Sequence, residues 1–366
     1  MKYIMNNFPI FKVGTVRNSF EMKLIHKATL KHNFVSIKYP TRLNAAPLDL
    51  SNFVPNEKHI YPVGQILVSI NKFINITTKY LGNNDGILDT SKSTKRKTLV
   101  SHAYNLMCMA LDISPSLHID VNDDDVLKHC GLGSAGAIIS AVCCSINELY
   151  GNPMKKLDII RYIMSNYGEE IDDYIENLRI VPSFGGSIAT GMAKSGVMVI
   201  AGMGVPIGTT NYNGQVIIGI PNDYSPNKAN EATKIENFDS YNIDLNSVRK
   251  ESYIISHDLV HKALPQLAYG NISILSDIVF NHRFTNGGIQ QCSFTFPRVN
   301  EIAANIKHLY ENGKCDMLSM SSNGPAFFAL VSNKNDKKEC IEQFSRQNMI
   351  VITASVYNGT YSVKKD

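Results

Sequence analysis

The residues from His129 to Ser140 have the types and spacing of an anion-binding loop. Gly131, Gly133 and Gly136 precede an apolar run that continues at helical spacing to Tyr150, which predicts a loop opening directly into a buried helix. Glycine lets backbone N–H groups face a ligand, and the N-terminus of a helix carries partial positive charge. A glycine-rich turn that only allows close packing is the alternative. The predicted phosphate-binding residues are Gly131, Leu132, Gly133, Ser134, Ala135 and Gly136.

Two further clusters of small residues each adjoin a predicted buried element. The second cluster contains Gly185, Gly186 and Ser187 and runs into an apolar strand that begins at Gly196. The third precedes a strand-like apolar run, and its candidate phosphate-binding residues are Ser321, Ser322 and Gly324. Three such clusters are hard to explain by packing alone, which favours a functional explanation.

Charged side chains near these clusters are candidates for catalysis and metal binding. Arg42 and Asp49 are the charged residues near the two ends of the segment 41–50, which follows a predicted strand of alternating apolar and polar residues. Each could also be an ordinary surface charge. Oxygen-bearing side chains that could bind a divalent cation are Ser134 and those of the acidic stretch 169–176, which contains Glu169, Glu170, Asp172 and Asp173. We interpret that stretch as a helix, and a solvated acidic helix face is the alternative.

Length and composition predict a soluble protein of two lobes. The chain has 366 residues, of which 44% are apolar and 19% charged, and its net charge of +4 is too mild for a typical nucleic-acid binder. The basic run 92–97 is interpreted as a solvated loop. Seven cysteines without C-x-x-C spacing indicate reduced core thiols. No signal peptide or membrane span is predicted, so we expect a cytoplasmic protein.

Periodicity along the chain predicts the following elements. Strands are expected at 34–39, ended by Pro40, and at 117–121, 196–200, 215–220, 327–331 and, as an edge strand, 349–352. Helices are expected at 99–111, from the first cluster to residue 150, and at 154–166, 253–264, 272–280 and 299–310.

The first and third clusters resemble two motifs of the GHMP kinase superfamily. Gly131-Leu132-Gly133-Ser134-Ala135-Gly136-Ala137 is similar to its phosphate loop, and Ser321-Ser322-Asn323-Gly324-Pro325 to its C-terminal glycine-rich motif. The resemblance implies an α+β, two-lobed, GHMP-kinase-like fold. Residues 1–205 would form the N-terminal lobe with the phosphate-binding loop, and residues 206–366 a ferredoxin-like α+β lobe.

Within the superfamily, the motifs resemble most those of the β-ribofuranosylaminobenzene 5'-phosphate synthases. Met320 to Pro325, Thr41 to Leu50 and Gly185 to Gly191 are each similar to a motif of these enzymes. This resemblance implies a glycosyltransferase that uses Mg²⁺ and transfers the 5-phosphoribosyl group of phosphoribosyl pyrophosphate (PRPP) to a carbon of a small aromatic acid. Such C-nucleoside formation would release pyrophosphate from PRPP and CO₂ from the aromatic acid by decarboxylation. The resemblance also implies a homodimer.

The resemblance gives Asp49 and Arg42 catalytic roles and leaves two other functions open. Asp49 would stabilise a cationic sugar carbon or act as a base, unless it only caps or braces its segment. The first alternative function is an ATP-dependent small-molecule kinase, although the segment from Pro182 to Gly191 lacks the acid that such kinases usually carry. The second is a phosphate-ligand-binding module without catalysis.

Overall fold

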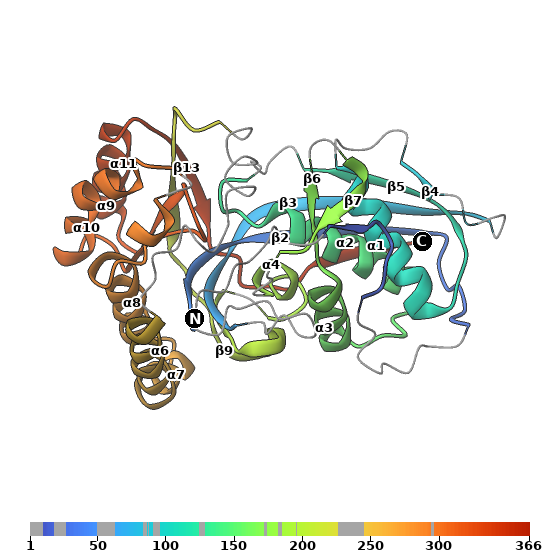
Figure 1. Ribbon diagram of the computed structural model, residues 1–366, viewed down its shortest axis with the longest axis horizontal. Helices are drawn as coiled ribbons and strands as arrows, with labels where there is room; N and C mark the ends of the chain where they lie inside the picture. The colour runs from blue at the N-terminus through green and yellow to red at the C-terminus, as the bar shows by residue number, and fades with distance from the viewer. Residues whose placement is uncertain are drawn as a thin grey trace.

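The structure is a computed structural model with two lobes that are both made of helices and sheet (Figure 1). The α+β fold class predicted from the sequence is confirmed. The residues that the structure describes are 10–17, 27–49, 63–82, 86, 88–90, 96–123, 129–171, 174–181, 185–194, 196–225, 245–293 and 296–366.

A seven-stranded sheet forms the centre of the N-terminal lobe. Its strands follow the order β14-β2-β3-β5-β4, and β8 pairs with the far end of β3 and with β9. The bounds are β2 (Phe34–Pro47), β3 (Gln65–Gly82), β4 (Leu88–Asp89), β5 (Ser116–Asn122), β8 (Val197–Ile200), β9 (Pro206–Thr210) and β14 (Ser362–Lys365).

Strand β2 does not end at Pro40 as predicted, because the strand passes through that proline and continues to Pro47. Its register with β3 shifts between Pro40 and Thr41, and a proline, which has no N–H to donate, is tolerated at such an irregularity. The longer strand carries Arg42 into contact with the glycine loop and Asn44 into contact with the third cluster.

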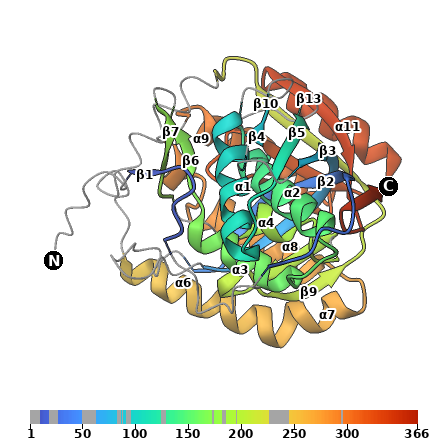
Figure 2. The same ribbon diagram turned by 90° about the vertical axis from the view of Figure 1, so that its right-hand side faces the viewer.

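Within the part of the chain that the structure describes, the N-terminal lobe has four helices, of which α2 and α4 contact this sheet, while α1 and α3 pack against α2 (Figure 2). They are α1 (Lys97–Leu111), α2 (Ser134–Leu149), α3 (Lys156–Asn166) and α4 (Gly186–Ala189). Every residue of α2 is buried, which a helix can tolerate only when apolar or small side chains surround it on all sides. The predicted helices at 99–111, after the glycine loop and at 154–166 are confirmed.

The acidic stretch forms strands, so our interpretation of it as a helix is wrong. A three-stranded sheet in the order β1-β7-β6 contains β1 (Ile10–Lys12), β6 (Glu169–Ile171) and β7 (Tyr174–Arg179). Strand β7 pairs with both other strands, and such non-local pairing is invisible to local periodicity. Asp172 and Asp173, the predicted metal ligands, lie outside the described residues.

The second lobe contains a four-stranded antiparallel sheet in the order β11-β12-β10-β13. The strands are β10 (Gln215–Pro221), β11 (Met317–Met320), β12 (Phe327–Val331) and β13 (Met349–Ser355), and β13 is an edge strand as predicted. The helical segments are α6 (Leu245–Asp258), α7 (Leu264–Ala268), α8 (Ser273–Phe280), α9 (Val299–Ile306), α10 (His308–Glu311) and α11 (Lys334–Arg346). Shorter helical turns are η1 (Gly202–Gly204), η3 (Leu259–Ala263), η4 (Asn281–Thr285) and η5 (Gln290–Cys292).

The chain crosses between the lobes more than once. Strand β9 lies just after the predicted boundary at 205/206 but pairs with β8, and β14, at the C-terminus, pairs with β2. Glu148 of α2 accepts hydrogen bonds from Tyr361 and Asn152 and forms an ion pair with Lys365, which fixes the returning C-terminal segment. The division into 1–205 and 206–366 remains a prediction.

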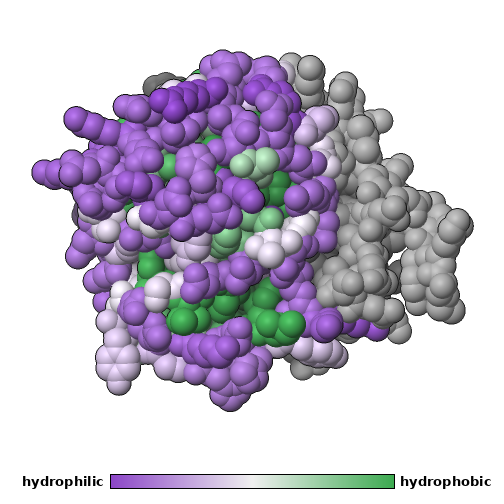
Figure 3. All heavy atoms as spheres, turned by 90° about the vertical axis from the view of Figure 1, so that its left-hand side faces the viewer, coloured by the Kyte–Doolittle hydropathy of each residue, from purple (hydrophilic) through white to green (hydrophobic). Residues whose placement is uncertain are grey.

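The outer face of the second lobe is mostly hydrophilic, and its apolar side chains gather in the lower half of the view in Figure 3. The helical segment from α6 to α7 carries exposed apolar side chains, namely Tyr253, Ile254, Val260 and Tyr269. Among the described residues, no helix is long and apolar enough to cross a membrane. All seven cysteines are free thiols, and six of them are buried.

One buried histidine makes stability depend on pH. His102 of α1 is fully buried, its Nδ1 accepts a hydrogen bond from Gly14 N at 3.0 Å, and its Nε2 lies 2.8 Å from Asn166 O. A neutral ring satisfies both contacts. Burial lowers the pKa of His102 from 6.5 to about 4. Between these two values the unfolded chain binds a proton that the folded chain does not, so stability falls as pH decreases.

We expect His102→Gln to flatten this dependence. In the wild type, this group alone removes on the order of 3 kcal/mol of unfolding free energy when pH falls from about 6.5 to about 4. Denaturant unfolding followed between pH 4.5 and pH 7 measures the slope. His261→Gln, at an exposed histidine, should keep the wild-type slope. An unchanged slope in His102→Gln would contradict the assignment.

Candidate functional site

The three clusters of small residues meet at the N-terminus of α2. The loop before α2 contacts the third cluster, because Ser321 Oγ donates a hydrogen bond to Gly131 O at 2.7 Å. It contacts the second cluster at Ser187, whose Cβ lies 3.0 Å from the position that a Cβ on Gly133 would occupy. Residues far apart in the sequence thus line one site at the positive end of a buried helix.

Two loop positions require glycine. Gly131 and Gly133 have φ angles of +97° and +71°, which residues other than glycine rarely adopt. A Cβ on Gly131 would lie 2.5 Å from Ser321 O, and one on Gly133 would lie 3.1 Å from Arg42 Nε. The loop therefore takes its shape and its close neighbours only because these side chains are absent.

Arg42 of β2 lies beside the loop. Its Nη1 donates to Gly131 O at 2.8 Å, while its buried Nε has no hydrogen-bond partner within the described part of the chain. Burial lowers the pKa of Arg42 to about 10, and the neighbouring Tyr167 and Glu169 oppose that change. The guanidinium stays charged at neutral pH, and an unpaired buried N–H next to an anion cradle is suited to an anionic ligand.

Arg96 is a site residue that our sequence interpretation missed. We placed it in a solvated basic loop, but it is 1% exposed. Its Nη1 donates to Ser134 Oγ at 2.7 Å, and its Nε donates to Glu170 Oε2 at 2.7 Å. Its position in the sequence could have indicated its burial, because Arg96 immediately precedes the apolar helix α1 and enters the core with it.

Glu169 and Glu170 of β6 bring carboxylates to the same end of α2. Glu170 pairs with Arg96, and Glu169 Oε1 accepts a hydrogen bond from Tyr167 Oη at 3.1 Å. Burial and the neighbouring Glu169 raise the pKa of Tyr167, so its hydroxyl remains protonated and donates. The site thus combines two arginines with two carboxylates around the first turn of α2.

The structure brings most of the predicted site residues together. The loop, the second and third clusters, Arg42 and Ser134 all lie around the N-terminus of α2. Ser322 N donates to Asn44 O at 3.0 Å, and Gly324 N donates to Ser321 O at 2.9 Å, so this part of the third cluster shapes the backbone.

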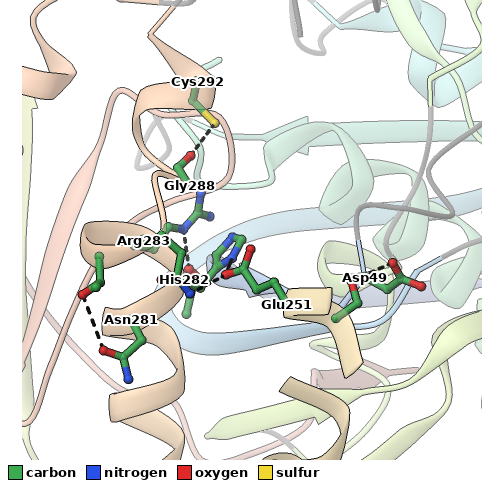
Figure 4. A network of polar contacts seen from close by, with 11 residues as sticks. Asp49, Glu251, Asn281, His282, Arg283, Gly288 and Cys292 are labelled. Carbon is green, nitrogen blue, oxygen red and sulfur yellow. Dashed lines mark hydrogen bonds and ion pairs between the residues drawn. The ribbon is translucent and has the colours of Figure 1, made fainter. Parts of the chain in front are cut away.

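Asp49 follows the end of β2 and contacts the second lobe. Its Oδ1 accepts a hydrogen bond from Ser252 Oγ of α6 at 2.9 Å (Figure 4). Between Arg42, beside the loop, and Pro47, the last residue of β2, the strand runs for roughly 16 Å of extended chain, so Asp49 follows Arg42 at the far end of the strand. The contact is what the bracing interpretation requires, and a catalytic role of Asp49 remains a prediction.

Comparisons with known proteins identify the fold. Residues 98–175 match the model of the GHMP kinases N terminal domain. A search of curated protein sequences finds no match. The structure of homoserine kinase from Cytophaga hutchinsonii aligns with a TM-score of 0.63 at 15% identity and covers 92% of this chain and 98% of that kinase.

Other similar structures are also kinases. Mevalonate kinase from Methanococcus jannaschii aligns with a TM-score of 0.53 at 15% identity, covering 90% of this chain and 99% of that one. A D-glycero-D-manno-heptose 1-phosphate kinase from Bacteroides thetaiotaomicron aligns with a TM-score of 0.54 at 14% identity, covering 91% and 99%. At such identities the likeness shows the fold.

These findings overturn the function expected from the motif resemblance. The interpretation as a PRPP-dependent glycosyltransferase that forms C-nucleosides with decarboxylation is wrong, and so is the pairing of PRPP with an aromatic acid, because the similar structures are kinases. The physical reason is that the small residues behind that resemblance determine the shape of the backbone, and such a shape suits any ligand that carries a phosphate. They therefore cannot distinguish one phosphate-bearing ligand from another.

The tertiary structure and the sequence match agree on the fold. The matched segment spans α1 from its second residue, the glycine loop, α2 and Glu169, whereas Arg42, Arg96 and the other two clusters lie outside it. The structural alignments extend over both lobes. Residues 98–175 of this chain thus match the GHMP kinases N terminal domain, and the chain shares the fold of the similar kinase structures.

Proposed function

We propose that this protein is an ATP-dependent kinase that phosphorylates a hydroxyl group of a small molecule. The observation that carries the proposal is the convergence of three glycine-containing clusters and two arginines on the N-terminus of α2. Phosphoryl transfer needs mainly positioning and electrostatic stabilisation, and this arrangement supplies both. The kinase folds of the similar structures support the same proposal.

In the proposed reaction, the glycine loop holds the phosphates of ATP. The backbone N–H groups around Gly133 and the positive end of α2 face the phosphates, and Arg42 Nε donates to the transferred group. The hydroxyl oxygen of the acceptor bonds to the γ-phosphorus while the bond from that phosphorus to ADP breaks. Glu169, which lies close enough to Arg42 to oppose the lowering of its pKa, takes the hydroxyl proton.

Magnesium fits this site as the counter-ion of ATP rather than as a metal held by the protein alone. Among the described residues, no group of three or more His, Cys, Asp or Glu side chains could hold a metal ion. Ser134 Oγ and Glu170 Oε2 each already accept a hydrogen bond from Arg96. A magnesium ion usually takes one or two protein oxygens in addition to phosphates and water, which these residues and Glu169 can supply, and it would neutralise phosphate charge.

The function is tested by incubating the purified protein with ATP, magnesium and a panel of alcohols. The panel should include amino-acid alcohols such as homoserine, hydroxy acids such as mevalonate, and sugars. We expect ADP and one phosphorylated product, identified by mass spectrometry. Saturable ATP binding without a phosphorylated product from any alcohol would overturn the proposal and favour a module that binds without catalysing.

Gly133→Ala should weaken ATP binding. The added methyl group would lie within about 3 Å of Ser187 and Arg42 and would stand where the backbone approaches phosphate. The positive φ angle costs roughly 1–2 kcal/mol of stability with any side chain. We expect ATP affinity, measured by calorimetry, to fall by about 10-fold or more, by loss of hydrogen bonds to charged groups.

Gly313→Ala is the matched control for this substitution. Gly313 has a similar φ angle of +66°, but a Cβ there would meet nothing within 4 Å. Gly313→Ala should therefore lower the unfolding free energy by a similar amount, because of its positive φ angle, while leaving ATP affinity unchanged. Equal ATP affinity in the two folded variants would show that the loop at Gly133 is only a packing turn.

Arg42→Met should reduce turnover by about 100-fold or more, the range seen when a group that stabilises transition-state charge is removed. Lys38→Met is the control, because Lys38 is an exposed cation on the same strand. Steady-state kinetics measure kcat for both variants, and thermal unfolding checks that both are folded. Wild-type kcat in Arg42→Met would exclude a role for this guanidinium in catalysis.

A further inference from the structure

A second buried arginine lies in the other lobe, outside the phosphate loop. Arg283 belongs to η4, is 3% exposed and donates from Nε to Ala45 O at 2.8 Å. No aspartate or glutamate among the described residues forms an ion pair with it. A buried charge without a counter-charge is unfavourable, so such a guanidinium is expected where an anion binds.

Figure 4 shows Arg283 with His282, Glu251 and Cys292. The carboxylate of Glu251 is held by hydrogen bonds from His282 Nδ1 at 2.9 Å and Asn286 Nδ2 at 3.1 Å rather than by Arg283. Cys292 lies against the guanidinium, and its thiol donates to Gly288 O at 3.4 Å. The turn that carries Arg283 and His282 is a π-helix, a widened form that occurs frequently at functional sites.

Arg283 is adjacent to the phosphate loop through β2. Ala45 O, which accepts from Arg283, also accepts from Ser319 Oγ at 2.7 Å. The preceding residue, Asn44, donates from its backbone N to Ser321 Oγ at 2.9 Å, and Ser321 in turn bonds to the loop. The guanidinium is therefore linked to the loop through the adjacent residues Ala45 and Asn44 and through Ser321.

Asn44 supplies a second, independent indication of a ligand. Its side chain is 2% exposed, and its Oδ1 has no hydrogen-bond partner in the described part of the chain. A buried acceptor of this kind is costly unless a donor completes it, and a ligand hydroxyl is a suitable donor. This unpaired acceptor belongs to the residue directly before Ala45, whose carbonyl accepts from Arg283.

We propose that Arg283 binds an anionic group, a carboxylate or a phosphate, on the phosphoryl acceptor. This inference rests on the proposed kinase function and specifies its substrate class. The acceptor is a small molecule that carries a hydroxyl group, directed to Asn44 and the loop, and an anion that the terminal nitrogens of Arg283 bind. A guanidinium recognises both kinds of anion through paired hydrogen bonds, which gives orientation as well as affinity.

The test begins with the wild-type enzyme and matched acceptors. With ATP, we compare hydroxy acids and sugar phosphates with their neutral amides and unphosphorylated sugars. We expect turnover with a carboxylate-bearing or a phosphate-bearing acceptor, and the two arms of the panel distinguish these sources. A neutral acceptor that is phosphorylated as efficiently as its charged analogue would overturn the proposal.

Variants then assign the effect to Arg283. For the charged acceptor, Arg283→Met should raise KM by about 100-fold, the effect expected for losing hydrogen bonds between charged groups, while KM for ATP stays unchanged. Arg283→Lys keeps the charge but not the paired geometry and should raise KM by about 10-fold. Arg298→Met, at a partly exposed arginine paired with Asp223, should behave as wild type. A wild-type acceptor KM in either Arg283 variant would contradict the proposal, and the lysine variant remains informative if the methionine variant does not fold.

A binding experiment separates failure of this inference from failure of the proposed kinase activity. Acetate and inorganic phosphate are titrated calorimetrically into the wild type, Gly133→Ala and Arg283→Lys without ATP. Anion binding that is lost in Arg283→Lys but kept in Gly133→Ala supports the subsite even if no alcohol is phosphorylated. Anion binding that depends on Gly133 but not on Arg283 would overturn it.

Discussion

One serine hydroxyl ties the phosphate loop to both lobes. Ser321 Oγ, in the second lobe, donates to Gly131 O of the loop and accepts from the backbone N of Asn44 in β2. A side chain on Gly131 would collide with Ser321 O, so this contact depends on the glycine. The loop can hold its shape only while both lobes stay in place, and the site is therefore a product of the whole chain rather than of the matched segment alone.

Electrostatics adds a second constraint at the same place. Arg96 is almost fully buried, and removing a guanidinium from water is costly unless good partners replace the water. Ser134 and Glu170 supply those partners and fix the first turn of α2 to β6. Positive charge held rigidly in a site of low dielectric constant acts strongly on a phosphate and needs little reorganisation during reaction. The fold therefore buries the charge of Arg96 next to the proposed phosphate site at the N-terminus of α2.

The similar structures share the fold of this chain at 13% to 15% identity. In the proposed acceptor subsite, the side chains come from distant segments: Asn44 from β2, Arg283 from η4 and the hydrogen-bonded pair of His282 and Glu251. Burial lowers the pKa of His282 while Glu251 opposes that change, so the pair is a polar element within the core. The proposed recognition of the acceptor therefore uses residues that no loop motif contains.

The sequence by itself determined most helices and the strands next to the glycine clusters, because these depend on local periodicity and on the backbone freedom of glycine. The fold class came from the resemblance of its motifs to those of the GHMP kinase superfamily. The sequence also placed Arg42, Ser134 and the three clusters in one functional group. Only the tertiary structure decided that β2 passes through Pro40, that the acidic stretch pairs as strands, and that Arg96 is buried. The physical reason is that strand pairing and the burial of a charge depend on partners distant in sequence. For the same reason, motifs that shape backbone around a phosphate identified the cradle but led to the wrong reaction.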